Sequence, residues 1–495
     1  MIISHDLGTT GDKATLVDET GRVLAAVTET YDTDFGLRGK AEQDADAWWR
    51  AVCAATRRLV DAHPEALDQI EGVSFSGQMM GAVLLDAEGR PVRPAIIWAD
   101  TRSVAQTGSL IDEIGMERAY AITGHRLNPT YSLSKVMWVR DNEPEAFART
   151  RHVVLAKDYV VHRLTGAIVT DPSDASSTNA YDQSAQDWSD DLFAAAGLDR
   201  GLFPEIAPST TIAGTVTAEA ARETGLREGT PVVLGGGDGP MAALGAGVLD
   251  ATCGAYAYLG SSSWVSLAAD APLHDPGMRT MTFNHVVPGQ FVPTATMQAG
   301  GASLEWIVST LAPGIEDRYA NLLGGAAEVS ASEDGLYFLP HLLGERSPYW
   351  NPRARAVFAG LARHHGPAHM TRAVLEGVAF NLYTGLRAFT ENGASIEHVD
   401  AIGGAANAGV LLRIFADVWG VPVRRRELVD EATSLGAAIV GGVGTGMFDS
   451  FEIARKFAEN RAEERPEPET HQRYAREYDV FMDAYRRLEP WFDTL

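Results

Sequence analysis

A turn of glycine and hydroxyl residues that occurs twice restricts the possible folds of this chain more than any other feature. Residues 7–11 read LGTTG and residues 259–263 read LGSSS, and strand-like segments flank both turns. A second, weaker similarity relates residues 72–81 to residues 399–409, because each segment reads as a short strand that ends in a glycine turn. Such a repeat predicts two structural units of one design. Two turns of this composition can close over a phosphate chain from opposite sides, because small residues let the backbone approach closely.

The plainer interpretation is chance similarity, since glycine supplies positive φ in many turns and threonine suits strand ends. The first turn also lacks the Gly-Lys-Ser/Thr of a P-loop and does not open a helix as G-x-G-x-x-G does. Both turns, however, lie near the start of one half of the chain. This matched position favours the functional interpretation.

The length and the order of elements predict an α/β protein. A chain of 495 residues can form two or three domains, each with its own core. Strand-like and helix-like segments alternate, and strands precede helices in both halves, which indicates two α/β domains. Residues 44–63 have a helical period with Asp44 or Asp46 as N-cap, and residues 70–77 read as a buried strand.

Composition excludes several kinds of partner. The net charge is 41 − 66 = −25 and is spread along the chain, which argues against a nucleic-acid or anionic-membrane partner. Cys53 and Cys253 are too few for a disulfide framework or a thiolate metal site. No apolar run approaches the length of a membrane span, and the N-terminus lacks a basic-then-apolar signal. We therefore expect a cytoplasmic protein.

An ordered series of motifs extends over essentially the whole chain, in segments 6–18, 74–91, 95–102, 132–145, 235–247, 258–263, 358–382 and 402–423. In these segments the sequence resembles the FGGY carbohydrate kinases, and within them the xylulokinase-like branch. It implies two actin-like, ribonuclease-H-like domains with ATP and sugar in the cleft between them. The implied domains are residues 1–245, on the sugar side with the metal and phosphate hairpin, and residues 246–495, on the nucleotide side.

Two acids are candidates for the chemistry. Phosphoryl transfer to a sugar hydroxyl needs a carboxylate that accepts the hydroxyl proton, and a metal that bridges the phosphates. Asp238 follows three glycines at a strand end, and the resemblance implies that it is the catalytic base and lies beside the metal. Its alternative role is the N-cap of the next helix. The resemblance aligns Asp6 with the acid that holds Mg²⁺, an ion that keeps much of its hydration shell.

The nucleotide is expected to contact both turns and two further glycine segments. The resemblance implies that the first turn binds the β- and γ-phosphates from one side and the second turn from the other. Segment 402–409 resembles the adenosine loop, and segment 298–306 resembles a further nucleotide segment. Lys13 can add positive charge, although a strand lysine more often faces solvent. The predicted ATP-binding residues are Thr9, Thr10, Lys13, Gly260, Ser261, Gly300, Gly301, Gly404, Ala405 and Asn407.

The expected sugar pocket departs from the xylulokinase pattern at two positions. Where xylulokinases commonly read Gln-Met-His-Gly, this chain has Gln78-Met79-Met80-Gly81, and Gly239 replaces an amide after the catalytic acid. An unpartnered buried hydroxyl costs on the order of 1–3 kcal/mol, so both changes can alter substrate choice. The methionines can instead be core packing. The resemblance implies that Trp98 stacks on the sugar, and Asp100 and Arg102 are either polar contacts or an ion pair. The predicted sugar-binding residues are Gln78, Met79, Met80, Trp98, Asp100 and Gly239.

The sequence therefore predicts an ATP- and Mg²⁺-dependent kinase of a small sugar or polyol, with a ketopentose such as D-xylulose as the first choice. A tetritol, a pentitol or L-xylulose are alternative substrates. An actin-like or chaperone-like ATPase would share the two hairpins without a sugar pocket. A catalytically silent sugar-binding relative is disfavoured, because Asp6 and Asp238 are both present. The expected partner is a small molecule rather than a nucleic acid or membrane, and a homodimer is left open.

Overall fold

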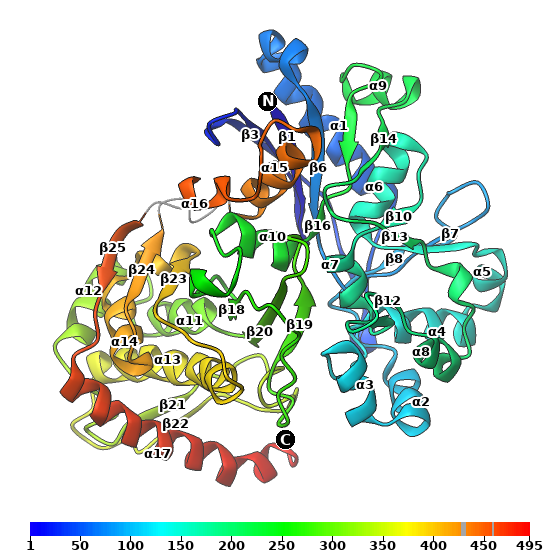
Figure 1. Ribbon diagram of the computed structural model, residues 1–495. Helices are drawn as coiled ribbons and strands as arrows, with labels where there is room; N and C mark the ends of the chain where they lie inside the picture. Colours follow the sequence, from blue (N-terminus) through cyan, green and yellow to red (C-terminus); the bar gives the residue numbers. More distant parts are fainter. Residues whose placement is uncertain (427–431, 458–459) are drawn as a thin grey trace.

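Two α/β lobes make up the protein, and each is built around a seven-stranded sheet (Figure 1). The computed structural model describes residues 1–426, 432–457 and 460–495. The first sheet has the order β14-β15-β6-β1-β2-β3, with β16 beside β6. Its strands are β1 (Ile2–Leu7), β2 (Gly11–Val17), β3 (Val23–Thr30), β6 (Gly72–Gly77), β14 (Ile212–Thr215), β15 (Pro231–Val233) and β16 (Gly236–Gly237).

The second sheet repeats the central pattern of the first. Its order is β19-β20-β18-β17-β23-β24-β25. In both sheets a first strand forms an antiparallel hairpin with the second strand and pairs in parallel with a later one, β1 with β6 and β17 with β23. The strands are β17 (Ala255–Leu259), β18 (Ser263–Leu267), β19 (Met281–Asn284), β20 (Phe291–Met297), β23 (Val399–Ile402), β24 (Val423–Arg426) and β25 (Asn460–Glu464). This duplication confirms the predicted pair of actin-like, ribonuclease-H-like units.

Helices with one buried face cover the sheets. In α1 (Ala45–Ala62), Trp48, Val52 and Leu59 are buried against the first sheet, and the Asp44 carboxylate accepts a hydrogen bond from the Asp46 amide at 3.0 Å. That N-cap satisfies one of the free amides at the helix start. The predicted helix over 44–63 and the buried strand over 70–77 are therefore confirmed.

The remaining elements form three groups. A helical cluster with its own core extends the N-terminal lobe, and five helices belong to the C-terminal lobe, of which α13 and α14 pack directly on the second sheet. The cluster holds α2 (Val104–Ile114), α3 (Met116–Thr123), α4 (Ser132–Asn142), α5 (Pro144–Arg149) and α8 (Asp190–Ala196), and the C-terminal lobe holds α11 (Gly301–Leu311), α12 (Arg318–Ala327), α13 (Pro367–Glu391), α14 (Gly409–Trp419) and α17 (Pro468–Phe492). Shorter or connecting elements are β4 (Asp34–Phe35), β5 (Ala41–Gln43), β7 (Val83–Leu85), β8 (Ala95–Ile96), β9 (His152–Val154), α6 (Ala156–Thr165), β10 (Val169–Thr170), α7 (Pro172–Ala175), β11 (Tyr181–Asp182), β12 (Asp187–Trp188), β13 (Glu205–Ile206), α9 (Ala218–Thr224), β21 (Tyr337–Leu339), β22 (Val357–Ala359) and α16 (Ile453–Phe457).

Two helices join the lobes through a shared core. The helix α10 (Asp238–Gly245) packs against α15 (Ala432–Thr445), which belongs to the second half of the sequence but lies on β1 and β6 of the first sheet. A Cβ on Gly441 of α15 would lie 2.9 Å from the Ser74 side chain, so this helix is in close contact with β6. The strands of each sheet come from one side of the predicted domain boundary at residue 245. The helix α15 comes from the C-terminal side of this boundary and packs on the N-terminal sheet. The lobes therefore share packing near the start of α10.

No helix within residues 1–426, 432–457 and 460–495 combines the length and the apolar character that a membrane span requires.

Candidate active site

The first repeated turn is held from three directions. The Tyr31 hydroxyl donates to the Gly8 carbonyl at 2.6 Å, and the Gln43 amide donates to the Thr9 carbonyl at 2.6 Å. The Trp98 indole donates to the Thr9 hydroxyl at 2.8 Å. Because three separate segments fix these atoms, the turn is preorganised, while the Thr10 side chain is exposed at its tip.

The second repeated turn is bound to the start of α11. The Gly301 amide donates to the Gly260 carbonyl at 2.8 Å, and the Ala302 amide donates to the Ser261 carbonyl at 3.1 Å. A Cβ on Gly301 would lie 2.4 Å from the Gly260 oxygen, and one on Gly300 would lie 1.9 Å from the Ser263 hydroxyl. The two predicted nucleotide segments, 259–263 and 298–306, are therefore in backbone contact, and this contact requires glycine.

A cavity of about 600 Å³ opens beside this second turn. Six predicted nucleotide residues line it, namely Gly260, Ser261, Gly301, Gly404, Ala405 and Asn407. Gly300 lines a small neighbouring cavity. The rest of the wall, which the sequence did not predict as nucleotide-binding, consists of Tyr258, Leu259, Leu304, Glu305, Tyr319, Leu323 and Ala408. Gly403 has φ of 92° and packs on the Leu259 backbone, so the loop after β23 needs glycine to approach the turn.

A second cavity of about 200 Å³ lies between the lobes. Its wall includes five residues that the sequence assigned to the sugar or to catalysis, namely Met79, Met80, Trp98, Asp238 and Gly239, and it also includes Thr9. The C-terminal lobe adds Tyr256, Ser262, Ser263, Trp264, Met281, Phe283, Thr294, Thr296 and Arg346. The wall of this cavity is thus shared by both halves, whereas the sequence assigned the sugar side to residues 1–245. Because Ser262 and Ser263 follow Gly260 and Ser261 directly, one hairpin borders both cavities.

Two carboxylates approach each other at this junction. Asp238 is the first residue of α10, and its carboxylate accepts a hydrogen bond from the Gly239 amide at 2.7 Å. Burial, and next the charge of Asp6, raise the pKa of Asp238 from 3.8 to about 7. Burial likewise raises the pKa of Asp6 to about 6, although Ser76 donates to its carboxylate at 3.1 Å. Two partly buried acids that repel each other form an environment that a cation would stabilise.

The donor set fits a magnesium ion that keeps most of its water. Within the described ranges there is no cluster of three or more His, Cys, Asp or Glu side chains able to hold a metal by itself. Mg²⁺ is commonly bound through one or two carboxylates together with water and substrate phosphates, and Asp6 and Asp238 supply that number. Lys13 stands opposite Asp6 in the β1–β2 register, and its charge acts to lower the pKa of Asp6.

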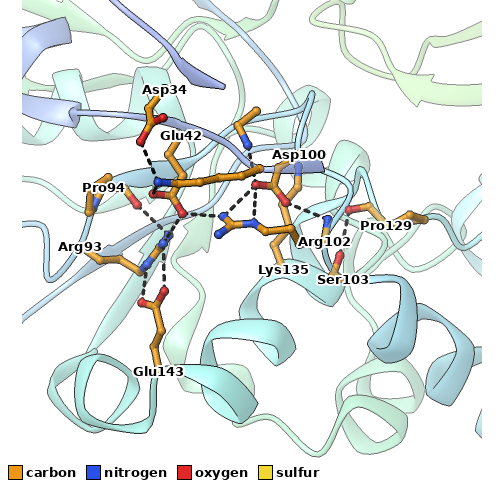
Figure 2. Close-up of polar contacts among 12 residues, drawn as sticks. Asp34, Glu42, Arg93, Pro94, Asp100, Arg102, Ser103, Pro129, Lys135 and Glu143 are labelled. Atoms are coloured by element: carbon orange, nitrogen blue, oxygen red, sulfur yellow. Dashed lines mark hydrogen bonds and ion pairs between the residues drawn. The ribbon is translucent and has the colours of Figure 1, made fainter. Parts of the chain in front are cut away.

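Two predicted sugar residues lie beside the second cavity rather than on its wall. The side-chain amide of Gln78 donates to the side-chain oxygen of Gln43 at 2.9 Å and to the Gly8 backbone carbonyl at 3.4 Å. Asp100 accepts from the Ala41 amide and from the Arg102 guanidinium, both at 2.8 Å. Figure 2 shows that Arg102 also reaches Glu42, which Arg93 contacts from the other side. The Asp100–Arg102 pair thus anchors the segment that carries Trp98, and both residues were expected as polar contacts or an ion pair.

The backbone of Met80 is unusual for a non-glycine residue. Its φ is 63°, its amide donates to the Ser177 hydroxyl at 3.1 Å, and its carbonyl accepts from the buried Lys135 ammonium at 2.7 Å. Left-handed conformation at such a side chain is rare and persists only where surrounding contacts impose it. Lys135 and Ser177 therefore direct the Met80 side chain toward the cavity, and burial lowers the pKa of Lys135 to about 7.

Sequence reasoning missed the residues that the C-terminal lobe contributes. Tyr256 and Trp264 lie on the strands that flank the second turn, so alternation along these strands was an available signal. Met281, Phe283 and Arg346 come from segments with no recognised motif. The Arg346 guanidinium lies 5.9 Å from the centre of the Trp98 ring, which is therefore covered on one face by a cation.

Two sheets that share a central strand pattern, a pair of glycine and hydroxyl hairpins, and an acid in the cavity between them define an actin-like phosphotransferase. Matches to known proteins specify the class further. The N-terminal domain of the FGGY family of carbohydrate kinases matches residues 1–245, and the C-terminal domain of that family matches residues 255–445. The chain belongs to the FGGY family of carbohydrate kinases, and it is an ATP-dependent sugar kinase. This membership decides against the ATPase alternative.

The chain resembles several kinases along nearly its whole length. It is 34% identical over 490 residues to a xylulose kinase of Escherichia coli strain K12, covering 99% of both chains. It is 31% identical over 502 residues to a gluconokinase of Bacillus subtilis strain 168, covering 99% of this chain and 96% of the relative. A ligand-bound xylulose kinase from Lactobacillus acidophilus superimposes with a TM-score of 0.94 at 25% identity, covering 100% and 99% of the two chains.

Proposed function

We propose that this protein phosphorylates a ketopentose, with D-xylulose as the first candidate, and that Asp238 is the general base. The observation that carries the proposal is the position of the Asp238 carboxylate on the wall of the cavity between the two hairpins. A base must lie within hydrogen-bond reach of the proton that it removes. A sugar in this cavity would meet that condition for one of its hydroxyl groups.

Transfer is direct and in line in this proposal. The sugar oxygen attacks the γ-phosphorus while its proton passes to Asp238, and the bond to the ADP oxygen breaks. The backbone of the turn at 8–11 contacts the β- and γ-phosphates from one lobe, and Gly260 and Ser261 do so from the other. Gly300, Gly301, Gly404, Ala405 and Asn407 hold the remainder of the nucleotide. Asp6 and Asp238 would hold Mg²⁺, which supplies positive charge at the phosphates.

The choice of substrate is supported by the size of the cavity and by the relatives. A volume of about 200 Å³ suits a small sugar, and several relatives are xylulose kinases. Because Met80 and Gly239 provide no side-chain hydrogen bond, hydroxyls near them are left without partners that xylulokinases commonly offer. The alternatives are therefore gluconate, L-xylulose, a tetritol and a pentitol.

A coupled ADP-release assay with each of these compounds tests the proposal. We expect Mg²⁺-dependent ADP release that is stimulated most by D-xylulose. A higher kcat/KM with gluconate or a polyol would overturn the choice of ketopentose, and ADP release that no sugar stimulates would overturn the kinase assignment. The cytoplasmic location and a homodimer stay predictions.

A further inference from the structure

A cation that no sequence motif identified faces the candidate base. Arg346 lies between β21 and β22, in the C-terminal lobe, and lines the cavity that also contains Thr9 and Asp238. Its guanidinium approaches the Trp98 ring at 5.9 Å, and Trp98 in turn holds the Thr9 hydroxyl. Arg346 is therefore at the junction of the two lobes, next to the turn expected to hold the phosphates.

No carboxylate of the described residues forms a direct ion pair with this guanidinium, although the charges of Glu345 and Asp238 act to raise its pKa. Among the described residues, the Arg346 side chain makes no hydrogen bond and no ion pair within 4.0 Å, and its Nε atom is buried without an acceptor. The adjacent acid, Glu345, is already engaged, because its oxygens accept from the Gln298 amide at 2.9 Å and from Asn381 at 3.3 Å. The face of Trp98 provides only a weak cation–π contact at this distance.

An unpaired charge in this position has a cost. Withdrawing a guanidinium from water is strongly unfavourable unless hydrogen bonds and an opposite charge compensate. Burial lowers the pKa of Arg346 from its usual value, which has the same physical origin. A chain that keeps such a group beside its candidate active site, despite this cost, is built to receive an anion there.

The anion that passes this point in the proposed reaction is the phosphoryl group. Gly260 and Ser261 border the nucleotide cavity, and Ser262 and Ser263 border the cavity of Arg346. In the proposed reaction the phosphoryl group therefore moves from the first cavity to the second along this hairpin. The charge of Arg346 also opposes the mutual repulsion that Asp6, Asp238 and a triphosphate would otherwise create. A guanidinium presents parallel N–H donors that match two oxygens of one phosphoryl group.

We propose that Arg346 binds oxygens of the phosphoryl group while it moves from ADP to the sugar oxygen. In that step the bond between phosphorus and the sugar oxygen forms, the bond to ADP breaks, and the sugar proton goes to Asp238. Arg346 exchanges no atom and supplies charge where negative charge develops, which acts mainly on the transition state. The inference rests on the proposed function, because it needs a phosphoryl acceptor in the second cavity.

The test compares Arg346→Met and Arg346→Lys with Arg353→Met as the matched control. Arg353 lies seven residues away, its side chain is 59% exposed, and its surface ion pair with Asp493 contributes little. Steady-state rates are measured with the best sugar of the panel. Calorimetry then measures binding of ADP alone and of ADP with Mg²⁺ and aluminium fluoride, which imitates the phosphoryl group in transfer. Circular dichroism and thermal melting check the fold of each variant.

We expect Arg346→Met to lower kcat by about 10²–10³-fold, as the loss of one preorganised donor does in other enzymes. ADP affinity should stay within about threefold of the wild type, while the aluminium fluoride complex weakens by a factor comparable to that in kcat. Arg346→Lys should keep part of the wild-type kcat and part of the affinity for the aluminium fluoride complex. Arg353→Met should change neither kcat nor this affinity. A third variant, Arg346→Ala, leaves space for a free guanidinium ion, and added guanidinium should restore part of its kcat.

Three results would overturn the inference. One is an Arg346→Met enzyme whose kcat is within threefold of the wild type. Another is an equal loss of affinity for ADP and for the aluminium fluoride complex, which would mean ground-state binding only. The third is a defect confined to sugars that carry a carboxylate, which would assign Arg346 to a substrate acid. Failure of the proposed function is separate, since it would appear as a wild-type enzyme that no sugar stimulates.

Discussion

A Cβ atom on Gly436 would lie 2.1 Å from the carbonyl oxygen of Met241, so α15 and α10 touch through their backbones. The contact is reciprocal, because a Cβ on Gly245 would lie 1.8 Å from the oxygen of Ala432. The helix that begins with Asp238 is thus fixed by a helix from the other half of the sequence. The position of the candidate base depends on packing between two glycines and two carbonyl groups.

Gly436→Ala should destabilise the protein, because the added methyl forces apart two packed helices. We expect a loss of about 3 kcal/mol in the free energy of unfolding, as for overpacked cores. Chemical denaturation measures this. The matched control is Gly108→Ala in α2, where a Cβ meets nothing within 4 Å and where alanine should stabilise by about 0.5–1 kcal/mol. Equal effects of the two substitutions would contradict the packing argument.

Asp238→Asn should abolish most transfer and leave the nucleotide site intact. An amide cannot accept the sugar proton, so we expect kcat to fall by about 10²–10⁴-fold. ATP affinity, measured by calorimetry, should stay within about threefold, because the residue lines the second cavity and not the larger one. Retention of kcat would remove Asp238 from the role of base.

Local signals account for the parts of the fold that the sequence predicted correctly. Asp44 before an amphipathic run predicted α1 and its cap, and an apolar run ending in glycine predicted β6. The repeated turns predicted two similar sheets, because each turn is the tight hairpin at the start of one sheet. These features depend on residues that are neighbours along the chain.

Long-range packing explains what the sequence could not predict. The apolar, glycine-rich run of α15 falls in the half assigned to the second domain, and only the folded chain brings it onto β1 of the first. Gln78 and Asp100 stand in motifs expected at the sugar, yet their partners, Gln43 and Arg102, bind them beside the cavity. Arg346 stands in no recognised motif. The residues that suggest its role, Thr9, Trp98 and Asp238, are more than 100 positions away in the sequence.

The hydrogen bond from Trp98 to Thr9 should matter for the phosphate turn. Thr9→Val removes the acceptor and Trp98→Phe removes the donor while each keeps much of the original shape. A double-mutant cycle on kcat/KM for ATP should give a coupling free energy of about 0.5–1.5 kcal/mol. Strictly additive effects would mean that this bond does not orient the turn.

Acid should destabilise the protein through His285, because the contacts of this ring favour its neutral form in the folded state. Its Nε2 pairs with the Val248 carbonyl at 2.8 Å, and its Nδ1 accepts from the Val287 amide at 3.2 Å, so the ring is held neutral. Burial lowers its pKa from 6.5 to about 4. The unfolded chain therefore binds more protons between these pH values, and the stabilisation is complete above pH 6.5 and declines as the pH falls toward 4.

The size of this effect can be isolated with His285→Gln, which keeps a donor toward Val248 and does not titrate. Between pH 7 and pH 5 the wild type should lose about 2 kcal/mol more than this variant in the free energy of unfolding. Denaturation by urea at several pH values measures the difference. Other buried groups titrate equally in both proteins, so they cancel in the comparison. Parallel stability curves for the two proteins would show that His285 is not held neutral by the fold.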